Sequence, residues 1–141
     1  MTDDEQALRW VERLRAGIDA FNREQFDETL EYMHPDIEWH RGEVSIEGGV
    51  IRGRDQLRAL MTPDMFDRQA LTINEVRVNG DRVLVETTFR VRGRSSGIEL
   101  ENRGWQVWTV RDELAVRVEL YDDQAPALAA AGLGATPAPP G

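Results

Sequence analysis

Two residue types that carry much enzyme chemistry are missing from this chain of 141 residues, which has no cysteine and no lysine. Without cysteine there is no disulfide framework, thiolate metal site or thiol nucleophile. Without lysine there is no amine for Schiff-base catalysis. The absence of cysteine also favours an intracellular protein.

Basic charge and long apolar runs are scarce as well. The 17 basic residues, all arginine, are outnumbered by 26 acidic ones, which gives a net charge of −9. Because this charge repels phosphate backbones and anionic lipid, we expect no nucleic-acid partner. No window approaches the roughly 20 apolar residues that span a bilayer, and the first residues are acidic where a signal peptide needs positive charge. We therefore expect a cytoplasmic protein with no membrane partner.

Histidine is limited to His34 and His40, which stand six residues apart with no cysteine to assist them. This spacing supports a metal site poorly. The chain also lacks a Gly-rich phosphate loop and a Gly-x-Ser-x-Gly motif. We expect no metal and no cofactor, so any reaction would be cofactor-independent.

The first half of the chain shows helical patterns. Apolar residues recur at three- and four-residue steps over residues 4–21, which predicts a helix. A shorter helix is predicted over 25–33, ended by Pro35, which disfavours the α conformation of the residue before it. A short strand, a glycine-rich stretch that predicts a loop or a distorted strand pair, and a third helix follow at 37–40, 41–53 and 54–61.

After Pro63 the apolar period changes to two, which is typical of strands. Four strands are predicted, at 71–79, 82–94, 98–110 and 114–121. The turns between them contain Asn79-Gly80-Asp81, Ser95-Ser96-Gly97 and Arg111-Asp112-Glu113, so the strands form consecutive antiparallel hairpins. With a last helix at 124–131, the pattern predicts one α+β domain over 1–133, its helices on one face of the sheet, and a disordered tail at 134–141.

Four short motifs accompany these elements: His34-Pro35-Asp36-Ile37-Glu38-Trp39, Ile51-Arg52-Gly53-Arg54-Asp55, Gly80-Asp81-Arg82-Val83 and Val118-Glu119-Leu120-Tyr121-Asp122. Together with the element order, they resemble the SnoaL-like branch of the nuclear-transport-factor-2-like superfamily. The resemblance implies a cone-shaped, curved antiparallel sheet wrapped by N-terminal helices, a cystatin-like α+β barrel with a pocket on its concave face. It also implies an outer face suited to homodimer packing.

The resemblance does not define an activity, because the superfamily includes polyketide cyclases, ketosteroid isomerases, limonene epoxide hydrolase, dehydratases and non-catalytic binding proteins. It does imply Glu119 as an acid–base residue in the pocket. The other two acid–base positions of the epoxide hydrolase fall on Thr88 and Arg90, and its water-holding positions fall on Trp39 and Arg41. That reaction is therefore disfavoured.

Strand pairing predicts which side chains accompany Glu119. If the last turn pairs Val110 with Leu114, Glu119 lies opposite Trp105. The preceding hairpin would pair Arg90 with Glu101 and Thr88 with Arg103. Strand alternation then brings one set of side chains to the pocket. In this set, Arg103 is the expected electrostatic partner of Glu119. The eight substrate-binding candidates are Trp39, Arg41, Glu86, Thr88, Arg90, Glu101, Trp105 and Tyr121. Trp108 is expected on the outer face, and Trp10 is expected to be partly exposed.

An enzyme is the leading hypothesis. Glu119 and Arg103 would cyclise, isomerise, hydrate or dehydrate an apolar carbonyl compound by acid–base catalysis. The alternative is a module that binds a hydrophobic ligand or acts as a dimeric scaffold, in which Arg90 and Glu101 form a cross-strand ion pair and Glu119 a structural hydrogen bond. A second alternative is epoxide hydrolysis.

Overall fold

The computed structural model describes residues 3–40, 50–61 and 66–133. Over these residues the elements are, in order, α1 (Asp3–Asn22), α2 (Phe26–Leu30), β1 (Met33–His40), β2 (Val50–Arg52), α3 (Arg54–Met61), β3 (Phe66–Asn79), β4 (Arg82–Gly93), β5 (Glu99–Arg111), β6 (Leu114–Tyr121) and α4 (Gln124–Ala130). None of the helices among them is long and apolar enough to cross a membrane. The predicted loop residues 41–49 and the predicted tail at 134–141 lie outside the described residues.

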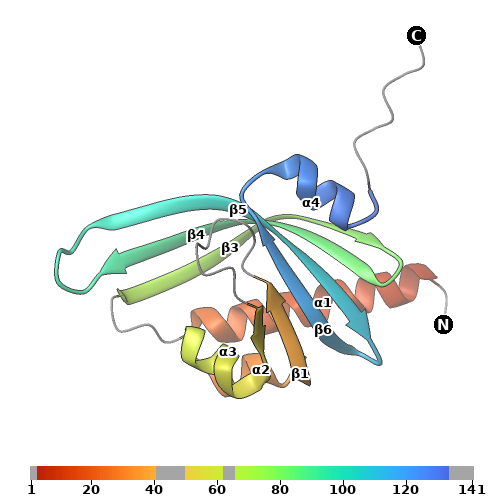
Figure 1. Ribbon diagram of the computed structural model, residues 1–141, viewed down its shortest axis with the longest axis horizontal. Helices are drawn as coiled ribbons and strands as arrows, with labels where there is room; N and C mark the ends of the chain where they lie inside the picture. Colours follow the sequence, from red (N-terminus) through yellow and green to blue (C-terminus); the bar gives the residue numbers. More distant parts are fainter. Residues whose placement is uncertain (1–2, 41–49, 62–65, 134–141) are drawn as a thin grey trace, which may run out of the picture.

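The strands form one open, curved sheet in the order β2-β1-β6-β5-β4-β3 (Figure 1). The predicted meander from β3 to β6 is confirmed. The sheet is not wholly antiparallel, however, because β1 runs parallel to β6. This pairing brings the first strand of the chain beside the last one, which no local sequence pattern indicates.

The N-terminal elements differ from prediction around Pro35. Helix α2 ends at Leu30, and β1 begins at Met33, so the residues expected to stop a helix belong to a strand. The register of β1 on β6 is irregular between Met33 and Glu38, which lets a residue without an N–H be accommodated there. Strand β3 is also longer than expected, because it begins at Phe66 rather than at residue 71.

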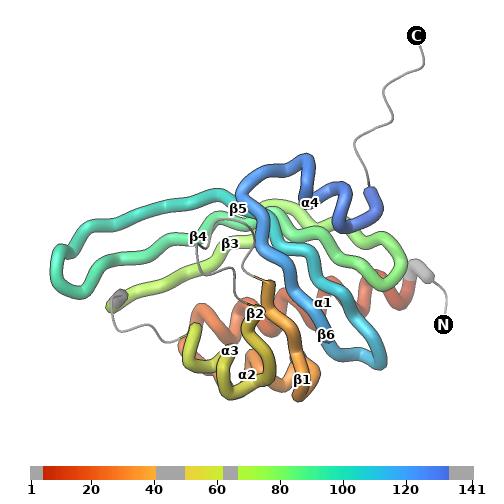
Figure 2. The backbone as a smooth tube through the Cα atoms, viewed as in Figure 1, coloured from red at the N-terminus to blue at the C-terminus, as the bar shows by residue number. Residues whose placement is uncertain are grey.

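The hairpin between β4 and β5 has the predicted register, with Arg90 opposite Glu101 and Thr88 opposite Arg103. It extends with β3 as a curved arm beyond the helices (Figure 2). The predicted ion pair between Arg90 and Glu101 is present, with 3.4 Å between Nε and Oε2.

The last hairpin has a different register. Its turn contains only Asp112 and Glu113, which both adopt positive φ (49° and 67°), so β6 is displaced by one residue from the predicted register. An irregularity between Thr109 and Val110 displaces β6 by one more. Glu119 therefore lies opposite Val107 rather than Trp105, and the predicted pairing was wrong. Because the displacement is two residues, each side chain keeps its face.

Helices pack on both faces of the sheet. Helices α1 and α3 pack on the concave face, where the main core contains Leu14, Ile37, Leu57, Val83 and Val118. Helix α4 lies on the opposite side (Figure 1), where Ala127 and Ala131 pack against Leu84 and Val107. The expectation that all helices share one face was therefore wrong for α4.

Two tryptophans are more buried than expected. Trp10 is 8% exposed and Trp108 is 6% exposed, and both belong to the core of the concave side. The expectations of a partly exposed Trp10 and an outward-facing Trp108 were wrong. The second error matters more, because it assigned the wrong face of β5 to the pocket.

Ile37 tests the core that joins β1 to the helices. Replacing this fully buried side chain by alanine (Ile37→Ala) should lower the free energy of unfolding by about 2–5 kcal/mol, since a cavity is left behind. Ile98→Ala is the matched control, because Ile98 is 61% exposed and its truncation should cost less than about 0.5 kcal/mol. Urea unfolding measures both, and equal losses would contradict the assignment of the core.

Candidate ligand-binding cavity

A cavity of about 510 Å³ lies between the helices and the concave face of the sheet. Its size falls within the range of roughly 300–1,000 Å³ typical of small-molecule sites. The helices contribute Ile18, Phe21, Leu57 and Leu60, and the strands contribute the aromatic side chains Trp39, Phe89 and Trp108. The walls are therefore mainly apolar and aromatic.

Most polar side chains in this wall are bonded to neighbouring protein groups. The Thr29 hydroxyl donates to the carbonyl oxygen of Gly17 at 2.9 Å, and the Gln69 amide donates to that of Met61 at 3.0 Å. The Trp108 indole donates to Oε1 of Gln106 at 2.9 Å. By contrast, Nε1 of Trp39 is buried and has no hydrogen-bond partner in the described part of the chain.

The cavity extends to the end of β6. Beyond this point, β5 is no longer paired with β6. The pairing of Trp105 with Tyr121 is the last between these strands, and Gly104 is so close that an added Cβ would lie 3.3 Å from the Tyr121 carbonyl oxygen. Residues of both faces border the cavity here, including Arg103 and the exposed Asp122. This edge forms a more polar mouth.

Four of the ten predicted site residues line the cavity: Trp39, Arg103, Trp105 and Tyr121. Arg103 does not meet Glu119, its expected partner. It forms an ion pair with Glu86, with Nε 2.5 Å from Oε1. This pairing neutralises the charge that was expected to hold a substrate oxygen.

Glu119 is not among the residues that line the cavity. It lies beside His40 on the neighbouring β1, on the face opposite to the core residue Val118. Its Oε2 accepts a hydrogen bond from the Tyr121 hydroxyl at 2.5 Å, and its Oε1 lies 3.3 Å from Nε of Arg117. The location provides no support for an acid–base role inside the cavity, except through Tyr121.

The remaining predicted residues also lie away from the cavity lining. Glu86 is 8% exposed and bound to Arg103, and the Thr88 hydroxyl accepts a hydrogen bond from the Asn74 amide at 2.8 Å. Arg90 and Glu101 form their exposed ion pair. Arg41 lies outside the described residues.

Each of the two histidines has a local contact with a nearby residue. His34 accepts a hydrogen bond at Nδ1 from the backbone N–H of Asp36, and Nε2 of His40 lies 3.0 Å from Oε1 of Glu38. The His40 contact lowers the pKa of the Glu38 carboxyl. Across the described ranges, no three histidine, aspartate or glutamate side chains are grouped so that they could hold a metal ion.

Sequence reasoning missed Thr87, Gln106 and Trp108 as cavity residues. One signal could have found them. On β4 the alternate positions Val83, Val85, Phe89 and Val91 are all apolar, whereas the other set contains Glu86, Thr88 and Arg90. The apolar set marks the core-facing side, and the pairing of Thr87 with Gly104 extends that side to β5.

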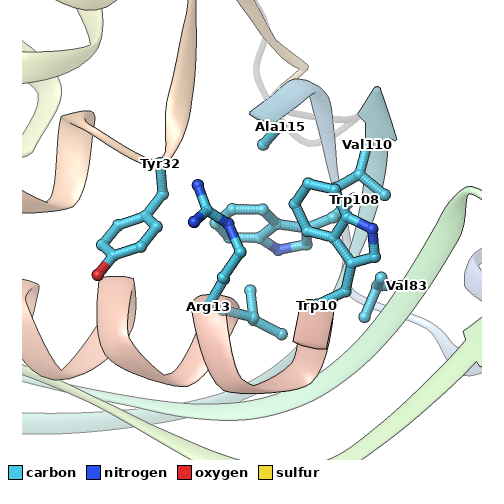
Figure 3. A pocket seen from close by; sticks show the side chains of 8 residues that line it. Trp10, Arg13, Tyr32, Val83, Trp108, Val110 and Ala115 are labelled. Atoms are coloured by element: carbon cyan, nitrogen blue, oxygen red, sulfur yellow. The ribbon is translucent and has the colours of Figure 1, made fainter. Parts of the chain in front are cut away.

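A second hollow, of about 20 Å³, lies between α1 and the β5–β6 hairpin (Figure 3). The Arg13 guanidinium stacks on the rings of Trp10 and Tyr32, at 5.7 and 5.0 Å from their centroids, and donates to the Glu113 carbonyl oxygen at 2.8 Å. This volume holds about one water molecule. These contacts hold the hairpin turn against α1, so we assign the residues around this hollow a structural role.

The open curved sheet, with helices packed on its concave face, is an architecture shared with nuclear-transport-factor-2-like proteins of known structure. The model of the SnoaL-like domain family matches residues 14–118, and the chain belongs to this family.

Solved structures are similar over most of their length. TerC, co-crystallised with polyporic acid, is 28% identical with a TM-score of 0.71, over 81% of this chain and 91% of TerC. An NTF2-like protein from Burkholderia xenovorans is 25% identical with a TM-score of 0.65, over 86% and 94% of the two chains. A putative SnoaL-like polyketide cyclase from Jannaschia shares the fold at 19% identity, with a TM-score of 0.70 and 94% coverage of both chains. A search of curated proteins found no match.

Tyr121 offers a direct test of the mouth geometry. Burial, followed by the hydrogen bond to Glu119, raises the pKa of Tyr121 to about 12. An unfolded tyrosine has a pKa of about 10, so between pH 10 and 12 the folded state holds a proton that the unfolded state has lost. Stability should therefore fall as the pH rises through this window, and Tyr121→Phe should remove that part of the fall.

The tyrosine titration can be assigned directly, because the chain has no cysteine or lysine side chain that titrates in the same pH range. Phenolate absorbance and urea unfolding would be followed against pH in the wild type and Tyr121→Phe, with Tyr32→Phe as the matched control. The assignment would be contradicted if the tyrosine with the raised pKa disappeared in Tyr32→Phe and was retained in Tyr121→Phe.

Proposed function

We propose that this protein binds a mostly apolar small molecule in the cavity between α1, α3 and the concave face of the sheet. The cavity itself, about 510 Å³ with aromatic and aliphatic walls, carries the proposal. A wall of this kind gains free energy by removing apolar ligand surface from water. Among the described lining residues, the charged ones are Arg103 and Asp122, near the end of β6, so charge is confined to the mouth.

The relative TerC supports the choice of a first probe, since it was co-crystallised with polyporic acid and shares 28% identity with this chain. Polyporic acid should raise the melting temperature of the wild type, because a ligand that binds only the folded state stabilises it. The same ligand should also change tryptophan fluorescence, as Trp39 and Trp108 both line the cavity.

A cavity-filling substitution tests the location. Leu60→Trp places a larger side chain on α3 where Leu60 lines the cavity, and should reduce the melting shift to less than a third of the wild-type value. Leu8→Trp adds the same indole at a 61% exposed position of α1 and should keep the shift. Equal shifts in the two variants would place the ligand elsewhere.

A second candidate function is cofactor-independent acid–base catalysis on the bound molecule, of the kind used by isomerases and cyclases. One observation favours it: Tyr121 borders the cavity and donates a 2.5 Å hydrogen bond to Glu119. The phenol oxygen would take a proton from the carbon next to a carbonyl group while its own proton moves to Oε2 of Glu119. The ligand would leave this step as an enolate.

Hydrogen–deuterium exchange at the carbon next to the carbonyl of 2-tetralone, followed by NMR in D₂O, tests this step without knowledge of the natural substrate. Wild-type protein should accelerate exchange, and Tyr121→Phe or Glu119→Gln should lower the acceleration by about a hundredfold. Glu101→Gln, at an exposed ion pair, is the control and should behave as wild type. If the wild type bound the ketone without accelerating exchange, the binding function would stand alone.

A further inference from the structure

Two residues that line the cavity on either side of β6, Trp39 and Gln106, each have an N–H donor with no hydrogen-bond partner among the described residues. One is Nε1 of Trp39, which is fully occluded and unpaired. Indole nitrogen can only donate, so its hydrogen needs an acceptor that the surrounding wall does not supply. Leaving a buried donor unpaired is unfavourable, but because this nitrogen is occluded, a ligand in the cavity cannot reach it in this arrangement.

The second donor is the side-chain amide nitrogen of Gln106, a cavity residue that is 8% exposed. The Trp108 indole lies 2.9 Å from Oε1 of Gln106. Since both the indole N–H and the amide NH₂ can only donate, the amide oxygen must face Trp108. Trp108 thereby sets the orientation of the amide and leaves its NH₂ as the free end, for which the described residues provide no hydrogen-bond partner.

The two donors lie on the same face of the sheet. Trp39 is on β1 beside Val118 of β6, and Val118 is also paired with Trp108 of β5. Gln106 is two residues from Trp108 on that same strand, so it projects from the same side. The two side chains therefore line the cavity from either side of β6, and of their donors only the Gln106 amide is available to a ligand.

The charges nearby indicate what kind of acceptor fits. Arg103 is paired with Glu86, and Asp122 is exposed at the mouth, so no described cation is available deep in the cavity, and the acidic groups of a probe such as polyporic acid would have to stay at the mouth. A buried charge without a partner is strongly disfavoured, whereas a neutral oxygen needs only a donor.

From these observations, and resting on the proposed binding function, we propose that the ligand carries a neutral carbonyl oxygen, as in a ketone or quinone, which accepts a hydrogen bond from the Gln106 amide nitrogen. Gln106 is the residue that determines specificity, and Trp108 is the residue that positions it.

The test compares benzophenone with diphenylmethane, two probes of similar shape of which only the first has a carbonyl group. Dissociation constants would be measured by tryptophan fluorescence for the wild type and Gln106→Met, which retains the length of the side chain and removes the donor. Benzophenone affinity should fall by about tenfold, and diphenylmethane affinity should stay within about twofold. Gln124→Met, at an exposed position of α4, is the control and should change neither constant.

The outcomes separate the two proposals. An equal change for both probes, or no change for either, would overturn the role of Gln106 and leave the cavity as a binding site. Failure of the wild type to bind either probe while polyporic acid still raises its melting temperature would overturn the inference alone, and failure to bind all three would overturn the binding function as well.

A measurement on the wild type covers the case in which Gln106→Met does not fold. The stretching frequency of ¹³C-labelled carbonyl in bound benzophenone should lie below its value in an apolar solvent, because a hydrogen bond weakens the C=O bond. Trp108→Phe, which frees the amide to rotate, should return the frequency part of the way. A bound carbonyl at its apolar-solvent frequency would overturn the proposal.

Discussion

The arrangement of this protein depends on the parallel pairing of β1 with β6. This ladder joins the N-terminal helices and first strands to the meander that follows, which would otherwise be connected mainly through the packing of α1. It is supported by the hydrogen bond from the Ala115 N–H to the Tyr32 carbonyl oxygen at 3.0 Å and by the full burial of Ile37 and Val118. Because β6 is paired with β1 on one side and with β5 on the other, the concave face is continuous from Trp39 to Trp108. The cavity exists because these two pairings hold its walls together.

The polar residues on the two faces of the sheet differ in how they are hydrogen-bonded. On the convex side, which α4 covers in part, the charged and phenolic groups are bonded to one another, as in Arg103 with Glu86 and Tyr121 with Glu119. On the concave side, the polar groups in the cavity wall are mostly uncharged and few, and the amide nitrogen of Gln106 has no hydrogen-bond partner in the described structure. Satisfied charges stabilise a surface modestly, whereas an unsatisfied donor in an apolar wall selects what is bound there. The hydrogen-bonded pair of Tyr121 and Glu119 therefore lies at the mouth of the cavity rather than deep inside it.

Much of the fold was predictable from local chemistry. The long helix, the meander and the register of the β4–β5 hairpin follow from apolar periodicity and from turn residues such as Asn79-Gly80, and each is confirmed. The candidate site was predicted less well, because polarity was used to choose the pocket face. Both sides of β4 are buried between Val83 and Thr87, since α4 covers the second side. A polar set on one face is then no evidence that this face lines a cavity.

By itself, the sequence determined the α+β class, the order of the elements, the pairing of Arg90 with Glu101 and the absence of cysteine and lysine chemistry, because these depend on residue type and on neighbours within a hairpin. Only the tertiary structure decided that β1 lies beside β6, that α4 packs on the convex face, and that Glu119 is directed away from the cavity while Gln106 is directed into it. The physical reason is that strand alternation defines two faces without saying which one is enclosed. Enclosure is decided by helices that are distant in the chain, through the apolar surface they bury.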